Sequence, residues 1–443
     1  MASDHLRRTP LRRRHLRSAA VCIALGAALF AVGALGFSPL GSATPDEAAS
    51  SGAPHGGSLP ALQQRARQFP TDPDAWSALG MAYVQQARQN ADPTTYAKAE
   101  SALRRSLKVQ PAGNDHAETA MAALAAGRHD FERALTWSLQ ATTTNPYSAP
   151  AYGVLADAYT QLGQYQKAFD AVQRMTDLRP DSTSLARASY TWELRGDERQ
   201  ARLLMSRSLT AAGSPTERAF AFTHLSLLAS DNGDPRTALD EAQSGLRETP
   251  HDSGLLEARA RALTARGNTT RAVRDYTEAI AVAPLPHYLL ALGELQQSLG
   301  HQDEAEDQYR VLRAQEAVRK ETGARPDTDA ILFEADHGDP RAAVGMGRQA
   351  IAARPFIAVH DAYAWALHRA DRDEEALVEA DRALTLGTRS ALFLFHRAMI
   401  HQSLGHTAEA RGDLRRALAI DAHFHPVHAP EARAALDRID GRR

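Results

Sequence analysis

The residues with the clearest potential for chemistry lie near the C-terminus, in a short tract rich in histidine. His423, His425 and His428 place three imidazoles within six residues, on either side of Pro426. Imidazole binds transition metals, but a zinc site needs about four ligands in a closed sphere. The tract holds no cysteine and no adjacent cluster of carboxylates. We therefore interpret it as a solvated connector and predict no metal and no other cofactor.

Other familiar catalytic patterns are missing from the sequence. The H-E-x-x-H, C-x-x-C, G-x-S-x-G, P-loop and G-x-G-x-x-G motifs do not occur. Gly345 and Gly347 lack the third glycine of a phosphate loop and lie in a predicted helix. The acidic pair Glu374-Glu375 has the usual place of carboxylates at the start of a helix, where they complement its dipole. We therefore predict that the protein is not an enzyme.

The charge balance argues against a nucleic-acid ligand. The 443 residues contain 51 Lys and Arg against 53 Asp and Glu, and six of the arginines lie within the first 18 residues. The remainder is mildly acidic, whereas a nucleic-acid interface needs a basic face. A hydrophobic content of 43% excludes global disorder. The abundance of Ala, Leu and Arg favours helices over sheets.

The N-terminal residues form a predicted targeting segment in three parts. Residues 1–18 are basic, residues 19–37 form an uncharged apolar run, and residues 38–60 are rich in Ser, Gly, Pro and Ala. Such a run can just cross a hydrocarbon core of about 30 Å, and the arginines before it should stay in the cytoplasm. A retained anchor fits its length, and a cleaved signal peptide fits the small residues Gly41 and Ala43. Both alternatives place the body outside the cytoplasmic membrane of a bacterium, on a flexible linker.

Beyond residue 70 one small residue recurs at intervals of 33 to 38 positions. The members of this alanine ladder are Ala99, Ala134, Ala168, Ala201, Ala238, Ala272, Ala305, Ala343, Ala376 and Ala410. A glycine precedes most of them by five residues, and a proline or glycine follows most of them by twelve. Apolar residues at helical spacing lie before each glycine, so each unit is predicted to be helix, turn, helix and stop.

A second small residue is expected to face each ladder alanine from the preceding helix. This position holds Ala156, Ser189 or Ala260 in three of the units, and Gly, Ala or Ser in most others. Two small residues at a helix crossing allow the helix axes to approach closely. That requirement explains why alanine, rather than any apolar residue, recurs in the ladder.

This unit resembles the tetratricopeptide repeat, a helix–turn–helix of 34 residues. Its signature is best matched by Trp76-x2-Leu79-Gly80-x2-Tyr83 with Ala99, Leu103 and Pro111, and with about seven inserted residues near positions 90–94. Residues 149–182 and 253–286 match without an insertion. The resemblance covers roughly residues 72–422. It implies an all-α fold, a right-handed superhelix of about ten repeats over residues 61–422, preceded by one N-terminal apolar helix.

Two parts of the array are expected to depart from the pattern. The unit at residues 306–355 carries Ile331 at the small position and Glu334 on the apolar face, so we expect a bend or local loosening there. Residues 423–443 are predicted to form a capping helix, because solenoids need to cover their last apolar face.

The resemblance also implies where a partner binds. In this family the concave groove is lined by two positions on the first helix of each repeat, which in this sequence include Met81, Asp157, Tyr190, Leu227, Glu257, Arg261, Glu294, Trp365, Phe395 and Met399. We refer to these ten residues as the groove row. The row lacks the Lys/Asn/Arg clamp that binds a C-terminal carboxylate in some relatives, which disfavours a cochaperone role.

The C-terminal end of the groove row is apolar, at Trp365, Phe395 and Met399. Two interpretations remain open: an anchor pocket for a partner, or a surface that the chain's own terminal segment covers. We predict a non-enzymatic scaffold that binds a protein or peptide in its groove and reaches the membrane through residues 19–37. The alternatives are a self-associating structural protein, present as a homo-oligomer, and an accessory subunit of an envelope enzyme or secretion complex.

Overall fold

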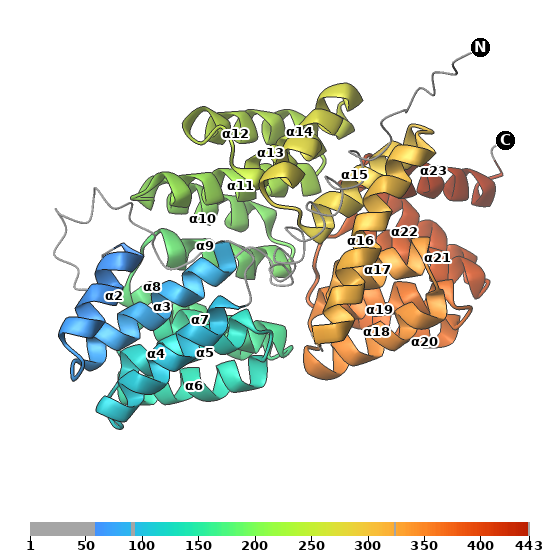
Figure 1. The fold of residues 1–443 in the computed structure, drawn as a ribbon. Coiled ribbons are helices and arrows are strands. Elements are labelled where there is room, and N and C mark those ends of the chain that lie inside the picture. Colours follow the sequence, from blue (N-terminus) through green and yellow to red (C-terminus); the bar gives the residue numbers. More distant parts are fainter. Residues whose placement is uncertain (1–57, 90–93, 323–324, 442–443) are drawn as a thin grey trace, which may run out of the picture.

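The computed structural model describes residues 58–89, 94–322 and 325–441, and within these ranges every regular element is an α-helix (Figure 1). The predicted basic region 1–18, the apolar helix 19–37 and residues 38–57 of the linker lie outside the described residues. Among the helices that are described, none has the length and apolar character needed to cross a membrane.

A first helix, α2 (Leu59–Gln68), leads into ten consecutive helix pairs. The first five pairs are α3 (Pro73–Gln89) with α4 (Thr95–Val109), α5 (Asp115–Gly127) with α6 (Phe131–Thr144), α7 (Ala149–Gln161) with α8 (Tyr165–Leu178), α9 (Ser182–Leu194) with α10 (Glu198–Ala211), and α11 (Pro215–Asp231) with α12 (Pro235–Glu248). Within each of these five pairs, each helix packs most closely on its partner.

The second five pairs are α13 (Ser253–Ala265) with α14 (Thr269–Val282), α15 (Pro286–Ser298) with α16 (Gln302–Thr322), α17 (Thr328–His337) with α18 (Pro340–Ala353), α19 (Ile357–Arg369) with α20 (Asp373–Ala383), and α21 (Ala391–Ser403) with α22 (Thr407–Ile420). A single helix, α23 (His428–Ile439), ends the array. The predicted all-α solenoid of about ten helix pairs is confirmed.

Every alanine of the ladder lies on the second helix of its pair, and each is at most 1% exposed. The facing small residues touch them directly. The Ser189 hydroxyl donates a hydrogen bond of 2.7 Å to the Ala201 carbonyl, and Ser226 makes the same bond to Ala238. A larger side chain at either position would have to separate the two helices, because these interiors are close-packed.

In most pairs the turn contains a glycine with a positive φ, and in the α9–α10 pair it also carries a helix cap. Gly196, for example, has a φ of 72°, a conformation that side chains with a Cβ disfavour. The Asp197 carboxylate that follows accepts a hydrogen bond of 3.0 Å from the Gln200 amide at the start of α10. This bond satisfies one of the free N–H groups at the helix terminus.

The unit at residues 306–355 departs from its neighbours in the lengths of its helices. α16 has 21 residues and α17 has 10, against 14 and 13 for α14 and α13. Ile331 is fully buried at the position that is small elsewhere. Glu334 lies beside the turn before α18, where its carboxylate accepts a hydrogen bond of 3.2 Å from the Asp339 amide.

The array curves so far that its two halves meet edge to edge, the green α8–α11 region against the orange and red helices (Figure 1). The turns of the third, fourth and fifth pairs face the connections that follow the eighth, ninth and tenth. A Cβ added to Gly163 would lie 2.7 Å from the Pro355 carbonyl oxygen. One added to Gly233 would lie 2.6 Å from that of Ile420. Successive helix pairs of one half therefore contact successive helix pairs of the other half.

Hydrogen bonds and apolar packing join the same two edges. The Tyr165 hydroxyl accepts a bond of 2.9 Å from the Ile357 amide, and the Thr388 hydroxyl donates one of 2.5 Å to the Leu194 carbonyl. Leu194 belongs to the largest buried apolar cluster, whose other members come from residues 331–435. The two halves of the solenoid thus share one core.

Candidate functional site

The groove row divides into exposed and buried positions. Seven of its residues are partly exposed: Met81, Asp157, Tyr190, Leu227, Glu257, Arg261 and Met399. Glu294, Trp365 and Phe395 are 7%, 2% and 0% exposed and are covered by other parts of the chain. In this conformation a binding partner could contact only the seven partly exposed residues.

Asp157, the charged residue nearest the N-terminal end of the groove row, forms an ion pair within the chain. The Arg187 guanidinium on α9 donates to both carboxylate oxygens of Asp157 on α7, at 3.0 and 2.9 Å. Arg187 itself is only 6% exposed. This bidentate pair ties two successive repeats together, and removing either partner would leave a charge poorly solvated.

The middle of the groove row, with the helical turn that follows it, carries an excess of carboxyl groups. Arg261 on α13 pairs with Asp231 on α11. Glu193 on α9 and Glu257 on α13 have no ion-pair partner within the ranges that the structure describes. Burial raises the pKa of Glu193 to about 8, and the charge of Asp231 adds to this rise. Burial likewise raises the pKa of Glu257 to about 7, against the opposing charge of Arg261.

We call Glu193, Asp231, Glu257 and Arg261 the acidic cluster. Three carboxyl groups of α9, α11 and α13 accompany one guanidinium, in surroundings that disfavour the charged form of an isolated carboxylate. The sequence predicted Glu257 and Arg261 but missed Glu193 and Asp231. Glu193 and Asp231 lie three and four residues after Tyr190 and Leu227 of the groove row. One further helical turn along the same face would have found them.

Two of the three residues at the apolar end of the groove row, Trp365 and Phe395, are covered by the terminal segment, residues 421–440. The His428 ring at the start of α23 stacks on Phe395, with centroids 4.9 Å apart, and meets Trp365 edge-on at 5.5 Å. The Phe424 ring is tilted against Phe395, with centroids 5.8 Å apart. The Trp365 indole N–H donates to both carboxylate oxygens of Asp336, at 3.0 Å. The sequence left open whether this surface is an anchor pocket for a partner or is covered by the chain's own terminal segment. In the structure the terminal segment covers Trp365 and Phe395.

Two histidines hold this segment in place through carboxylates of distant helices. His425 Nε2 lies 2.9 Å from Glu294 Oε2 on α15, and His428 Nε2 lies 3.7 Å from Asp336 Oδ2 on α17. Burial would lower the pKa of His428, but the neighbouring carboxylates of Asp336 and Glu431 raise it to about 9. Burial would raise the pKa of Glu294, yet neighbouring imidazolium charge, first that of His425, holds it well below its usual range.

The prediction of a solvated histidine connector is therefore wrong for His425, which is half-buried, and for His428, which is buried. It is confirmed only for His423, which is exposed. The reason is that carboxylates supplied by α15 and α17, far away in sequence, neutralise the two imidazoles. Over the described ranges of the chain, no three His, Cys, Asp or Glu side chains converge as metal ligands would.

Comparison with known proteins finds one repeat by sequence and similar helical arrays by structure. Residues 149–182, which form α7 and α8, match the family model "Tetratricopeptide repeat". No curated protein sequence matches the chain.

Similar solved structures include the APC/C hetero-tetramer Cut9-Hcn1, at 14% identity over 86% of this chain and 81% of that chain, with a TM-score of 0.41. A thermophilic TPR protein of Thermus thermophilus is 20% identical over 43% of this chain and 99% of that chain, with a TM-score of 0.38. The human IFIT1 dimer with PPP-AAAA is 13% identical over 81% of this chain and 94% of that chain, with a TM-score of 0.44. By sequence, residues 149–182 of this array of helix pairs are thus similar to the tetratricopeptide repeat.

Proposed function

We propose that the protein is a non-enzymatic scaffold that binds a basic segment of a partner protein on its concave surface. The acidic cluster carries this proposal. Its carboxyl groups lie at partly exposed positions of successive first helices, and they outnumber the one guanidinium among them. A Lys or Arg side chain of a partner would stabilise the ionised form of Glu193 and Glu257.

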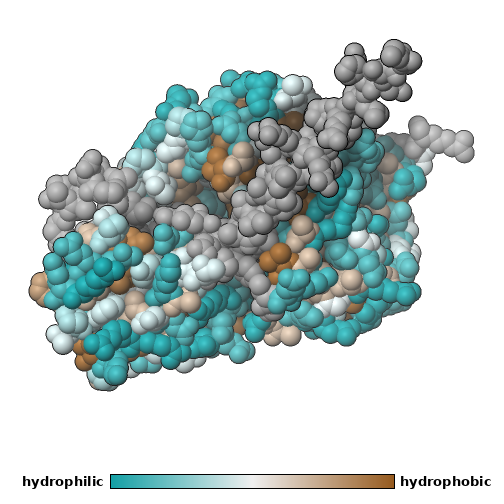
Figure 2. All heavy atoms as spheres, in the orientation of Figure 1, coloured by the Kyte–Doolittle hydropathy of each residue, from teal (hydrophilic) through white to brown (hydrophobic). Residues whose placement is uncertain are grey.

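The remaining surface supports a polar mode of binding. The face drawn in Figure 2 is mainly hydrophilic, with small separate hydrophobic areas. The large apolar side chains exposed in the described ranges lie on different helices or connections: Phe69, Leu139, Tyr147, Leu203, Val282, Leu299 and Val378. Isolated apolar side chains are normal on a protein surface, whereas an apolar docking site needs a contiguous patch. Charge complementarity is therefore the better basis for recognition.

Peptide binding to the full-length chain tests this function. A labelled 15-residue peptide rich in Lys and Arg, and a matched peptide with Glu at the same positions, are titrated while fluorescence anisotropy is measured. We expect binding of the basic peptide alone. Its affinity should rise between pH 6 and pH 9, because carboxyl groups with raised pKa values ionise in this range, whereas ordinary surface carboxylates are already charged.

Two variants sharpen the test. The double substitution Glu193→Gln with Glu257→Gln should lower the affinity for the basic peptide by about tenfold or more. A tenfold change corresponds to about 1.4 kcal/mol. Glu132→Gln, which changes an exposed carboxylate on α6, is the matched control and should leave the affinity unchanged. Equal binding of both peptides, or an affinity for the basic peptide that does not vary with pH, would remove the basis of the proposal.

We also propose that residues 1–37 place this scaffold outside the cytoplasmic membrane of a bacterium, as the basic region and the apolar run predict. Alkaline phosphatase fused after residue 443 should be active, and green fluorescent protein at the same position should be dark. The opposite pattern would locate the body in the cytoplasm. N-terminal sequencing of the mature protein distinguishes a retained anchor from cleavage after Ala43.

A further inference from the structure

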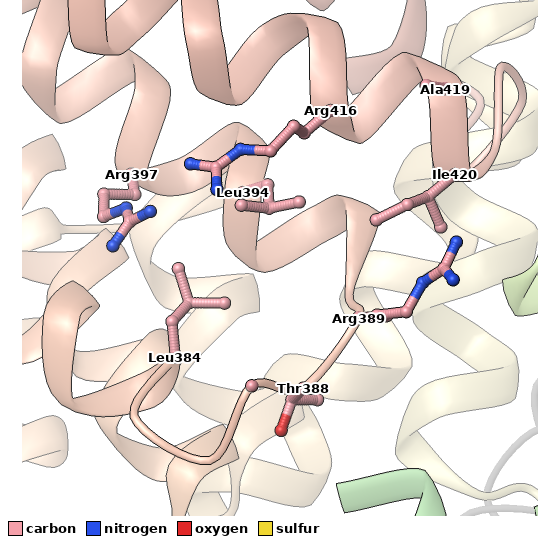
Figure 3. Close-up of a pocket in the computed structure, with 9 residues that line it drawn as sticks. Leu384, Thr388, Arg389, Leu394, Arg397, Arg416, Ala419 and Ile420 are labelled. Atoms are coloured by element: carbon pink, nitrogen blue, oxygen red, sulfur yellow. The ribbon is translucent and has the colours of Figure 1, made fainter. Parts of the chain in front are cut away.

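A separate hollow of about 450 Å³ lies between the α20–α21 connection and the helices α21 and α22. Its apolar wall is formed by Leu384, Leu394 and Ile420, and none of its lining residues belongs to the groove row. Figure 3 shows the guanidinium groups of Arg397 and Arg416 on the side of Leu394, and that of Arg389 on the opposite side, beside Ile420.

The three arginines are not fully neutralised by carboxylates. Arg397 donates to both oxygens of Asp413, at 2.8 and 3.1 Å, and at 2.8 Å to Asp381. Arg416 pairs with the same Asp413, which is 1% exposed. Arg389 is exposed and has no carboxylate within ion-pair distance in the ranges that the structure describes. One positive charge therefore remains at the rim, on Arg389.

The backbone that carries Arg389 is held in place before any ligand arrives. Thr388, its neighbour, donates a hydrogen bond of 2.5 Å to the Leu194 carbonyl of the other half of the array. Gly387 packs against the Gly196 turn. Anchoring on a rigid neighbour reduces the conformational entropy that a binding loop loses when it orders around a ligand.

We propose that this hollow binds an organic carboxylate with a short aliphatic chain, its carboxylate at Arg389 and its hydrocarbon part against Leu384, Leu394 and Ile420. A guanidinium fork matches the two oxygens of a carboxylate. The single excess charge suits a monoanion better than a dianionic phosphate. The volume of the hollow lies within the range of small-molecule pockets. Apolar atoms of a ligand would remove the aliphatic wall from water, which favours binding.

Direct titration of the full-length chain by isothermal calorimetry tests the site with four probes. 4-Methylpentanoate carries both parts of the ligand, 4-methylpentanamide lacks the charge, acetate lacks the aliphatic part, and inorganic phosphate is charged without being apolar. We expect 4-methylpentanoate to bind at least tenfold more tightly than each of the other three. Phosphate or acetate binding equally well would reduce the hollow to a patch of surface charge and overturn the proposal.

Variants locate the binding to the hollow. Arg389→Gln should lower the affinity for 4-methylpentanoate by at least tenfold. Arg271→Gln, at an exposed arginine of α14, should leave this affinity unchanged. Arg389 is chosen because removal of Arg397 or Arg416 would leave the buried Asp413 with less compensation. Unchanged affinity in the Arg389→Gln variant, with a normal helical circular dichroism spectrum, would refute the assignment.

A peptide separates the two sources of this ligand chemistry. A peptide with blocked ends and the internal sequence Asp-Leu presents the same carboxylate and aliphatic groups as part of a protein. Tighter binding of this peptide than of 4-methylpentanoate assigns the site to a partner protein, and weaker binding assigns it to a free small molecule. The hollow shares no residue with the acidic cluster, so failure here leaves the basic-peptide result unaffected.

Discussion

Replacing Gly196 with alanine tests the contact between the two halves of the solenoid. Gly196 forms the α9–α10 turn with a φ of 72°, and a Cβ at this position would overlap the Gly387 carbonyl oxygen. Gly300 offers a matched control, because it forms the equivalent α15–α16 turn with a φ of 81° and has nothing within 4 Å of an added Cβ. The two substitutions share the backbone strain and differ in the lateral contact.

The expected magnitudes follow from these two environments. An alanine in the left-handed region costs about 1–2 kcal/mol, and this applies at both turns. At Gly196 the overlap adds the cost of overpacking, about 1–3 kcal/mol. Overpacking is partly relieved if the halves move apart, but that movement breaks the Thr388–Leu194 hydrogen bond, worth about 1 kcal/mol. We therefore expect Gly196→Ala to lose about twice as much stability as Gly300→Ala.

Two measurements check this reasoning. Urea unfolding followed by circular dichroism compares the midpoints and slopes of the transitions directly, because repeat arrays need not unfold in two states. Small-angle X-ray scattering then shows whether the Gly196→Ala variant expands. Equal losses of stability, together with identical radii of gyration, would mean that the turn and the Gly387 connection do not touch in solution.

Three further perturbations address the helix crossings and the terminal segment. Ala168→Leu or Ala272→Leu should each cost about 1–3 kcal/mol by overpacking a crossing, whereas Ala281→Leu, at an exposed position of α14, should be neutral in the same urea unfolding. Trp365→Ala should lower the thermal midpoint and cost about 3–5 kcal/mol, because the indole is buried; unchanged stability would instead indicate an open pocket. The pKa of His428 is raised above that of an unfolded histidine, so its contribution to stability is full below about pH 6.5 and is lost as the pH rises through about 9. Hydrogen exchange of residues 428–439 should accordingly be faster at pH 9.5 than at pH 6.5 after correction for intrinsic rates, and His428→Gln should abolish that difference.

The helix pairs themselves could be predicted from the sequence, because the contacts that define them are local. Ala201 meets Ser189 across twelve residues, and the turn glycine between them is part of the same short segment. Such a unit depends on its own residues and its nearest neighbours, so its pattern repeats visibly along the chain. The family resemblance, the ten pairs and the position of every ladder alanine follow from this local order.

The closure of the array and the state of the groove depend on tertiary structure. Gly196 and Gly387 are far apart in sequence, and small rotations added over the intervening pairs decide which edges meet. Neither glycine carries a local signal of that contact. The histidine tract shows the same limit: His425 would be a solvated loop residue in isolation, but a hydrogen bond to Glu294, 131 residues earlier, holds it against α15. Helix pairing was thus decided by neighbouring residues, whereas the burial of Trp365 was decided by tertiary structure, because the terminal segment packs back on α19 and α21.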